Sequence, residues 1–354
     1  MKQLLHESIV FANKAHKGQL RKGTDIDYIS HPMEVMQILT AMRADDDLII
    51  AGVLHDTVED TATTVEEIAE KFGHDIATLV AHHSQDKSKP WDERKAEVID
   101  DLERADRRTK MLVLADKVSN LRSMYANYQE VGESLWERFN APKEKQCWYY
   151  SKVHDALWDI SEFEDVEPIY DEMTNLFKDI FVTYKVDREA GVLFQVSATE
   201  TYILTKGIPT WELTDEKPSL FTEEISRGEA EMLEEEWNQI FWECCEADLD
   251  DFECVLVDEE TKYARIQIED AKITFEGHDV GLGCNIITGG DEYQYFVSLD
   301  HDDTYDFICH LRAKGGTEKP LEELLLENFE GNDAFAKFMD FCKTEEIKYV
   351  FYSL

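Results

Sequence analysis

The sequence is poor in positive charge and in cysteine. Its 354 residues contain 36 Lys and Arg against 77 Asp and Glu, which gives a formal net charge of -41. A surface of this charge repels nucleic acid and anionic membranes, so we expect neither as a partner unless a local basic patch intervenes. The seven cysteines include no Cys-x-x-Cys pair. This argues against a zinc ribbon or a disulfide framework and favours reduced thiols in a cytoplasmic protein.

Long apolar runs are also absent. The chain has no stretch of about 18 consecutive apolar residues, so we expect no membrane-spanning helix. Polar residues interrupt its N-terminal segment, and we expect no signal peptide there. With 43% hydrophobic residues, the chain is nevertheless long and apolar enough to form two globular domains.

Charge and hydrophobic pattern divide the chain into two domains, 1–182 and 183–354. The first contains 36 acidic and 22 basic residues, and the second contains 41 and 14. Helical periodicity dominates the first domain, whereas alternating strands and helices follow in the second. We therefore expect an all-α helical bundle followed by an acidic α+β domain of unknown role. The acidity of the second domain suits a basic protein partner, or simply a solubilising surface.

Several elements can be assigned at this stage. Helices are predicted over 3–17, 48–56, 97–128, 165–181, 223–247 and 321–341. The polar stretch 82–97 contains Pro90 and is predicted to be a loop. A hairpin is predicted over 182–196, with further strands over 252–257, 263–268, 272–275, 295–299 and 349–352.

The most informative stretch runs from Leu54 to Thr61. Adjacent His55 and Asp56 offer an imidazole nitrogen and a carboxylate oxygen, which Zn²⁺, Mn²⁺ and Fe²⁺ accept as ligands. Glu59 and Asp60 follow three and four residues after Asp56, and they share its face if the segment is helical. For a single His-Asp pair, the ordinary interpretation is a buried histidine and a helix-end carboxylate.

Other polar residues stand beside apolar helical runs. His31 precedes Pro32, a residue that suits the first turn of a helix. Asp116 follows a buried-looking run, and an unpaired buried carboxylate is costly, so a metal ion is a candidate partner. Arg21 and Lys22 form a short basic pair that, taken alone, indicates a solvated loop.

Taken in order, these motifs resemble the HD-type hydrolase domain of the RelA/SpoT homologues. The similarity is greatest to the small alarmone hydrolases of the Mesh1 type, and it covers about residues 1–180. The motifs are Arg21-Lys22, Tyr28-Ile29-Ser30-His31-Pro32, His55-Asp56-Thr57-Val58-Glu59-Asp60-Thr61 and Leu114-Ala115-Asp116-Lys117-Val118-Ser119-Asn120-Leu121-Arg122. Residues 183–354 contain no counterpart of the family's synthetase motifs.

The resemblance implies roles for particular residues. The family's manganese ligands match His31, His55, Asp56 and Asp116. Its catalytic acidic pair matches Glu59 and Asp60. Its basic pair and its base-proximal asparagine match Arg21, Lys22 and Asn120. Lys117 is a further cation able to balance phosphate charge.

The expected function is therefore manganese-dependent removal of the 3′-pyrophosphate from guanosine alarmones such as ppGpp and pppGpp. One alternative is a phosphohydrolase of the same site type that acts on the 2′-phosphate of NADPH, another pyrophosphorylated nucleotide or an RNA end. The other alternative is a catalytically silent regulatory protein that binds a partner.

Overall fold

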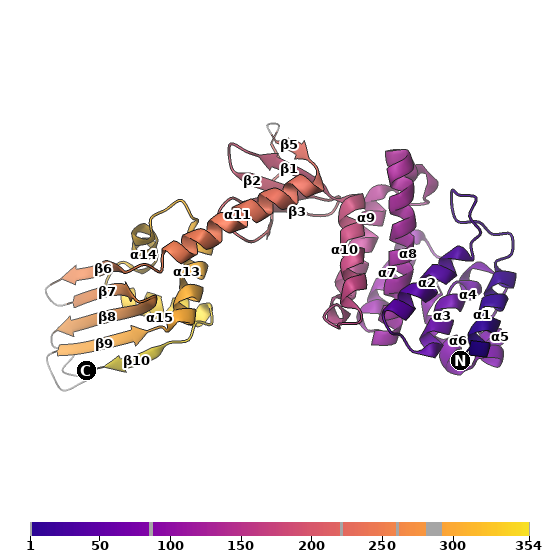
Figure 1. The fold of residues 1–354 in the computed structure, drawn as a ribbon, viewed down its shortest axis with the longest axis horizontal. Coiled ribbons are helices and arrows are strands. Elements are labelled where there is room, and N and C mark those ends of the chain that lie inside the picture. The colour runs from indigo at the N-terminus through magenta and orange to yellow at the C-terminus, as the bar shows by residue number, and fades with distance from the viewer. Residues whose placement is uncertain (1, 85–87, 220–221, 260–261, 281–291, 354) are drawn as a thin grey trace. The chain divides into compact units, whose positions relative to one another are not determined.

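The computed structural model describes residues 2–84, 88–219, 222–259, 262–280 and 292–353. The chain divides into two compact units, each with its own hydrophobic core (Figure 1). Unit one comprises Met1–Thr183 and Val196–Glu200. Unit two comprises Tyr184–Gln195 and Thr201–Leu354.

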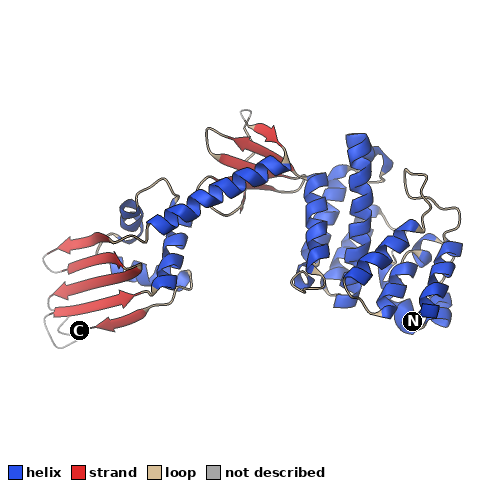
Figure 2. Ribbon diagram, in the orientation of Figure 1, coloured by secondary structure: helices blue, strands red, loops and turns tan. Residues whose placement is uncertain are grey.

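Unit one is built of helices, which confirms the fold class predicted for this part of the chain (Figure 2). Its α-helices are α1 Lys2–Ala15, α2 Ser30–Ala41, α3 Asp46–Leu54, α4 Thr57–Asp60, α5 Val65–Phe72, α6 His74–His83, α7 Trp91–Glu103, α8 Arg107–Val131, α9 Lys143–Ala156 and α10 Glu167–Phe181. Two 3-10 helices complete it, η1 Gly132–Arg138 and η2 Trp158–Ile160.

Helices α3 and α8 form the centre of unit one. Asp45 caps α3 by accepting a 3.0 Å hydrogen bond from the Leu48 amide, and Asp106 caps α8 by accepting one of 2.8 Å from the Thr109 amide. Each cap satisfies an amide that the helix itself leaves unpaired. All residues of α8 from 110 to 119 are buried, and α3 is apolar and mostly buried. The polar residues at their ends and within α8 are thereby held inside the core.

The predicted loop over 82–97 is wrong for most of that stretch. Helix α6 continues to His83, and α7 begins at Trp91, directly after Pro90. Among the residues of α7 only Ile99 and Leu102 are buried, so its sequence is mostly polar although it is helical. The predicted single helix over 97–128 is also wrong. The chain turns between the end of α7 at Glu103 and the start of α8 at Arg107.

Unit two contains two five-stranded sheets. The first has the order β4-β3-β2-β1-β5 and the second β10-β9-β8-β7-β6. Its strands are β1 Thr183–Asp187, β2 Val192–Val196, β3 Thr201–Thr205, β4 Glu212–Leu213, β5 Glu223–Ile225, β6 Phe252–Glu259, β7 Lys262–Glu269, β8 Lys272–Val280, β9 Glu292–Ser298 and β10 Val350–Ser353. The helices among its described residues are α11 Arg227–Ala247, α13 His301–Gly315, α14 Leu321–Phe329 and α15 Ala334–Thr344.

The second sheet packs one face against helices. Strands β6 to β9 pair in antiparallel sequence, and buried residues alternate with less buried ones along β7. Phe275 of β8 and Phe307 of α13 lie with ring centroids 5.0 and 5.2 Å from that of Phe338 in α15. This aromatic core confirms the predicted α+β class of the second half.

In unit two, the predicted helices over 223–247 and 321–341 differ from the helices in the structure. Residues 223–225 form strand β5, and α11 begins only after Ser226, whose hydroxyl accepts a hydrogen bond from the Glu229 amide. The predicted helix over 321–341 is two helices, α14 and α15. Gly331 lies in the turn between them with φ of 108°, a left-handed conformation that glycine adopts without strain.

Two expectations from the sequence concern the cysteines and the absence of a membrane-spanning helix. Six cysteines carry free thiols, and Cys284 lies outside the described residues. Within the described ranges, no helix combines the length and the apolar character needed to cross a membrane.

Candidate metal and phosphate site

Two closely packed helices bring His31 and His55 together. His31 is the second residue of α2, and His55 directly follows α3. The helices approach closely at Gly52, where an added Cβ would lie 2.4 Å from Leu39 Cδ1. Both imidazole rings are buried, so their nitrogens need partners within the protein.

The partners of the Nδ1 atoms fix the tautomer of each ring. His55 Nδ1 lies 2.7 Å from the Gly52 carbonyl oxygen, which only accepts, so Nδ1–H donates. His31 Nδ1 lies 2.8 Å from Ser119 Oγ, and that hydroxyl donates to Glu34 Oε2 at 2.7 Å. The Ser119 oxygen is therefore left to accept from His31. Both rings then carry their proton on Nδ1 and direct an Nε2 lone pair into the site.

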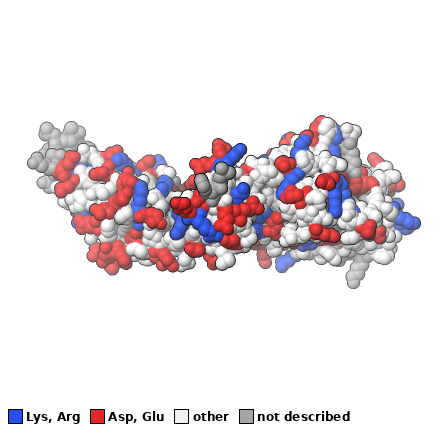
Figure 3. All heavy atoms as spheres, turned by 90° about the horizontal axis from the view of Figure 1, so that it is seen from above, with Lys and Arg blue, Asp and Glu red and all other residues white. Residues whose placement is uncertain are grey.

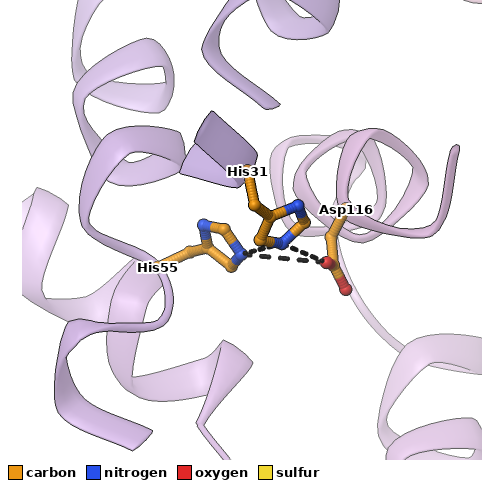
Figure 4. A group of neighbouring side chains, drawn as sticks. All are labelled: His31, His55 and Asp116. Carbon is orange, nitrogen blue, oxygen red and sulfur yellow. Dashed lines mark hydrogen bonds and ion pairs between the residues drawn. The ribbon is translucent and has the colours of Figure 1, made fainter. Parts of the chain in front are cut away.

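The two Nε2 atoms face each other at 3.2 Å (Figure 4). Two carboxylates flank them: His31 Nε2 lies 3.1 Å from Asp116 Oδ1, and His55 Nε2 lies 3.0 Å from Asp56 Oδ2. Two nitrogen lone pairs at this separation repel each other. A positive species, either a proton or a metal ion, must therefore lie between them.

The pKa values of His55 and Asp56 describe the site when a proton, and not a metal ion, lies between the two Nε2 atoms. Burial lowers the pKa of His55, but attraction to Asp56 and hydrogen bonds to Asp116 and Asp56 outweigh this and raise it to about 10. Burial raises the pKa of the Asp56 carboxyl, yet the neighbouring histidines hold it well below its usual range. The Asp56 carboxylate is thus kept ionised, and a metal ion would compete with the proton on His55.

Asp116 has close partners besides the histidines. Lys117 Nζ and Asn120 Nδ2 each donate to its carboxylate at 2.6 Å. Burial raises the pKa of Asp116, but Lys117 and the hydrogen-bonded histidines hold it well below its usual range. Asp116 is thus paired within the protein, and its burial alone does not call for a metal ion. The argument for a metal rests instead on the opposed histidine nitrogens.

The acidic pair lies one turn from Asp56. Glu59 and Asp60 belong to the short helix α4, and the Asp60 amide donates to the Asp56 carbonyl oxygen at 2.8 Å. The hydroxyl of Tyr28 lies 2.7 Å from Asp56 Oδ2 and 3.2 Å from Asp60 Oδ2. Both acidic residues are half-buried, which gives them access to water at the edge of the cluster.

Of the basic pair Arg21 and Lys22, Arg21 contacts a residue of the site that is distant in the sequence. Arg21 Nη1 donates to Asn120 Oδ1 at 3.4 Å, although the residues are 99 positions apart. Asn120 in turn contacts Asp116, so the structure links Arg21 to the cluster. Lys22 is exposed, and its Nζ lies 5.3 Å from the centre of the Phe139 ring.

Two further side chains contact the cluster, Tyr28 and His83, and a third, Lys95, interacts electrostatically with Asp116 and Lys117. His83 Nε2 lies 3.5 Å from Asp116 Oδ2. Lys95 of α7 is half-buried with its Nζ 4.5 Å from the centre of the Tyr149 ring. Burial and then repulsion from Lys117 lower the pKa of Lys95 to about 7. The sequence did not point to His83 and Lys95 because both lie in the stretch 82–97, which was predicted to be a loop.

The donor set fits a divalent transition metal ion. One ligand atom each from His31, His55 and Asp116 lie within 4.8 Å of one another, and the same holds for His55, Asp56 and His83. Imidazole nitrogen and carboxylate oxygen are ordinary ligands of such ions. The cluster can therefore hold a metal ion.

Comparison with known proteins agrees with this geometry. A protein-family model described as an HD domain matches residues 8–140, which lie within unit one. The guanosine-3′,5′-bis(diphosphate) 3′-pyrophosphohydrolase MESH1 of Xenopus tropicalis is 40% identical over 124 residues, which are 34% of this chain and 69% of that protein. MESH1 of Homo sapiens is 39% identical over 125 residues, with the same two shares.

A larger protein is also similar to part of this chain. The GTP pyrophosphokinase of Myxococcus xanthus is 36% identical over 130 residues, which are 34% of this chain but only 17% of that protein. The helical bundle and its His-Asp cluster thus define an HD-domain protein. Within that class, the chain belongs to the MESH1 family of hydrolases.

Proposed function

We propose that the chain hydrolyses the 3′-pyrophosphate of guanosine alarmones, converting ppGpp or pppGpp and water into GDP or GTP and pyrophosphate. The observation that carries the proposal is the pair of imidazole Nε2 atoms 3.2 Å apart beside two buried carboxylates. Similarity to the MESH1 proteins supports the substrate, since those relatives bear the name of this activity.

Four side chains would hold the metal ion, for which the family resemblance implies manganese: His31, His55, Asp56 and Asp116. A divalent ion supplies Lewis acidity, which polarises water and phosphate oxygens. The chain fixes both imidazole tautomers through Gly52 and Ser119. It also keeps both carboxylates ionised through their low pKa values. Such supporting contacts orient ligands and tune their basicity.

Glu59 and Asp60 are proposed to move protons. In the reaction, the oxygen of water bonds to the phosphorus nearest the ribose, the bond from that phosphorus to the 3′ oxygen breaks, and the 3′ oxygen gains a proton. Glu59 accepts a proton from the attacking water as a general base. Asp60, held by the Tyr28 hydroxyl, orients the water, and the proton taken up by Glu59 passes to the leaving 3′ oxygen.

Basic residues offset the charge of the substrate. Arg21, Lys22 and Asn120 are proposed to contact its phosphates and base, with Arg21 and Asn120 already linked at 3.4 Å. The Lys117 ammonium is engaged by Asp116, so it contributes mainly through its positive field. A local group of cations of this kind is needed because the chain as a whole carries a net charge of -41.

Turnover of a nucleotide panel by the full chain with Mn²⁺ tests the substrate. Release of pyrophosphate from ppGpp supports the proposal. Dephosphorylation of NADPH or an RNA end with no action on ppGpp supports the alternative phosphohydrolase, which the same donor set would serve. A chain that binds metal and nucleotide but turns over nothing would instead be a regulatory module.

For the chain as a whole, we propose that residues 1–182 carry catalysis and that residues 183–354 have a separate role. Residues 183–354 contain 41 acidic and 14 basic residues, and Figure 3 shows acidic patches interspersed with basic side chains along the chain. Such a surface suits a basic protein partner in the cytoplasm, where the free thiols would stay reduced. A pull-down with the full chain tests this, since a basic partner should be captured at low salt and released at high salt.

A further inference from the structure

A third histidine lies against the cluster. His83 is the last residue of α6, and its side chain is 9% exposed. Its ring centre lies 4.9 Å from that of His55, with the ring planes at 81°. Its Nε2 atom lies 3.5 Å from Asp116 Oδ2, the carboxylate oxygen that Lys117 also contacts.

The helical repeat of α6 directs this side chain inward. Leu79 and Val80 are buried, and His83 follows them by four and three residues on the same face of the helix. His82 and Thr78, four residues apart, lie on the other face and are exposed. The packing of α6 on the core thus places one of two adjacent histidines at the site and leaves the other in solvent.

The ligand atoms of His83 and the proposed metal ligands occupy a small volume. Those of His55, Asp56 and His83 lie within 4.8 Å of one another, and so do those of His31, His55 and Asp116. Metal–ligand bonds of roughly 2.0–2.3 Å allow two ligands of one ion to lie up to about 4.6 Å apart. His55 belongs to both groups, and His83 Nε2 also lies 3.5 Å from Asp116 Oδ2, so His83 lies close to three of the four proposed ligands.

We propose that His83 is a fifth protein ligand of the metal, giving a set of three imidazoles and two carboxylates. This inference rests on the metal site proposed above and extends it. Its consequence concerns metal preference. Imidazole suits Fe²⁺, Co²⁺ and Zn²⁺, whereas Mn²⁺ favours carboxylate and water oxygen. A third imidazole should raise the affinity for the former ions more than the affinity for Mn²⁺.

Metal affinity of the full chain tests the inference. Kd values for Co²⁺ and Mn²⁺ would be measured by competition with a chelator for the wild type, His83→Ala and His82→Ala. We expect His83→Ala to lose about tenfold or more in Co²⁺ affinity and clearly less in Mn²⁺ affinity. We also expect it to change the visible absorption of bound Co²⁺. His82→Ala, the matched exposed neighbour, should leave both Kd values and the spectrum unchanged.

Three other outcomes of these Kd measurements would contradict the role of His83. Equal Co²⁺ affinity and spectrum in His83→Ala and wild type would overturn the role of His83 and leave the four-ligand site standing. An equal loss for both ions would show a general structural effect and would also overturn it. If the wild type binds neither ion, the metal site itself fails, and this inference fails with it.

A measurement on the wild type does not depend on how a variant folds. X-ray absorption by the Co²⁺-loaded full chain reports the number of imidazole rings around the ion. Three rings are expected if His83 binds the metal, and two rings would contradict it.

Discussion

The hydroxyl of Tyr28 donates a 2.7 Å hydrogen bond to the carboxylate of Asp56. The same hydroxyl lies 3.2 Å from Asp60 Oδ2, so one side chain joins a proposed metal ligand to a proposed proton-transfer residue. Burial, followed by the charge of Asp56, raises the pKa of Tyr28 far above its usual range, so the hydroxyl stays protonated. It can therefore always donate.

Removal of this hydroxyl should damage the site without abolishing it. Tyr28→Phe leaves both carboxylates with one donor fewer, and loss of an outer contact of this kind typically costs about 10- to 100-fold in metal affinity or activity. We expect a fall in that range in kcat/KM or in Mn²⁺ affinity. Tyr305→Phe, in unit two, is a control that should change neither. A Tyr28→Phe variant with unaltered metal binding and turnover would contradict the role given to this contact.

Glu59 should matter for chemistry and not for metal binding. Glu59→Gln keeps the shape of the side chain but cannot accept a proton, so we expect kcat to fall by about 100-fold or more. Equilibrium dialysis should still find the metal bound. Asp56→Ala is the contrasting variant, which should lose both metal and turnover. Loss of metal in Glu59→Gln would show that Glu59 is a ligand and not a base.

Lys95 should make substrate capture sensitive to pH. With a pKa of about 7, Lys95 is charged below pH 7 and neutral above it. We propose that charged Lys95, which interacts electrostatically with Glu59 and Asp116, also attracts the substrate phosphates. This cation is lost as the pH rises, so kcat/KM should fall on the alkaline side of pH 7. A metal ion near Asp116 would lower this pKa further, which shifts the fall to lower pH without changing its direction.

Lys95→Arg supplies the matched comparison, since the arginine side chain stays charged at every accessible pH. Its kcat/KM should lack the fall that the wild type shows as the pH rises through the pKa of Lys95, or show a much smaller one. Identical pH profiles for Lys95→Arg and wild type would assign the fall to another group.

Local sequence pattern predicted the helical character of the first unit, and the family resemblance supplied the four proposed metal ligands. His31 follows a loop and starts a helix, while His55 and Asp56 end an apolar one, and these features are visible within a few residues. The structure places His31 Nε2 within 3.4 Å of His55, Asp56 and Asp116, and it places His55 Nε2 within 3.7 Å of both carboxylates.

What the sequence did not reveal depends on packing between segments. The contact of Tyr28 with Asp56 joins residues 28 positions apart, and no local spacing predicts it. Lys117 contacts Asp116, although neighbours on a helix usually point in different directions. His83 was missed because α7 buries few residues, so a polar stretch around Pro90 was interpreted as a loop.

The central claim is that the His-Asp cluster cleaves the 3′-pyrophosphate of a guanosine alarmone. The most direct test is to incubate the purified full chain with ppGpp and Mn²⁺ and to separate the products, with Asp56→Ala in parallel. The account predicts GDP and intact pyrophosphate in equal amounts from the wild type, and no products from Asp56→Ala. Unchanged ppGpp, orthophosphate in place of pyrophosphate, or equal turnover by Asp56→Ala would contradict it.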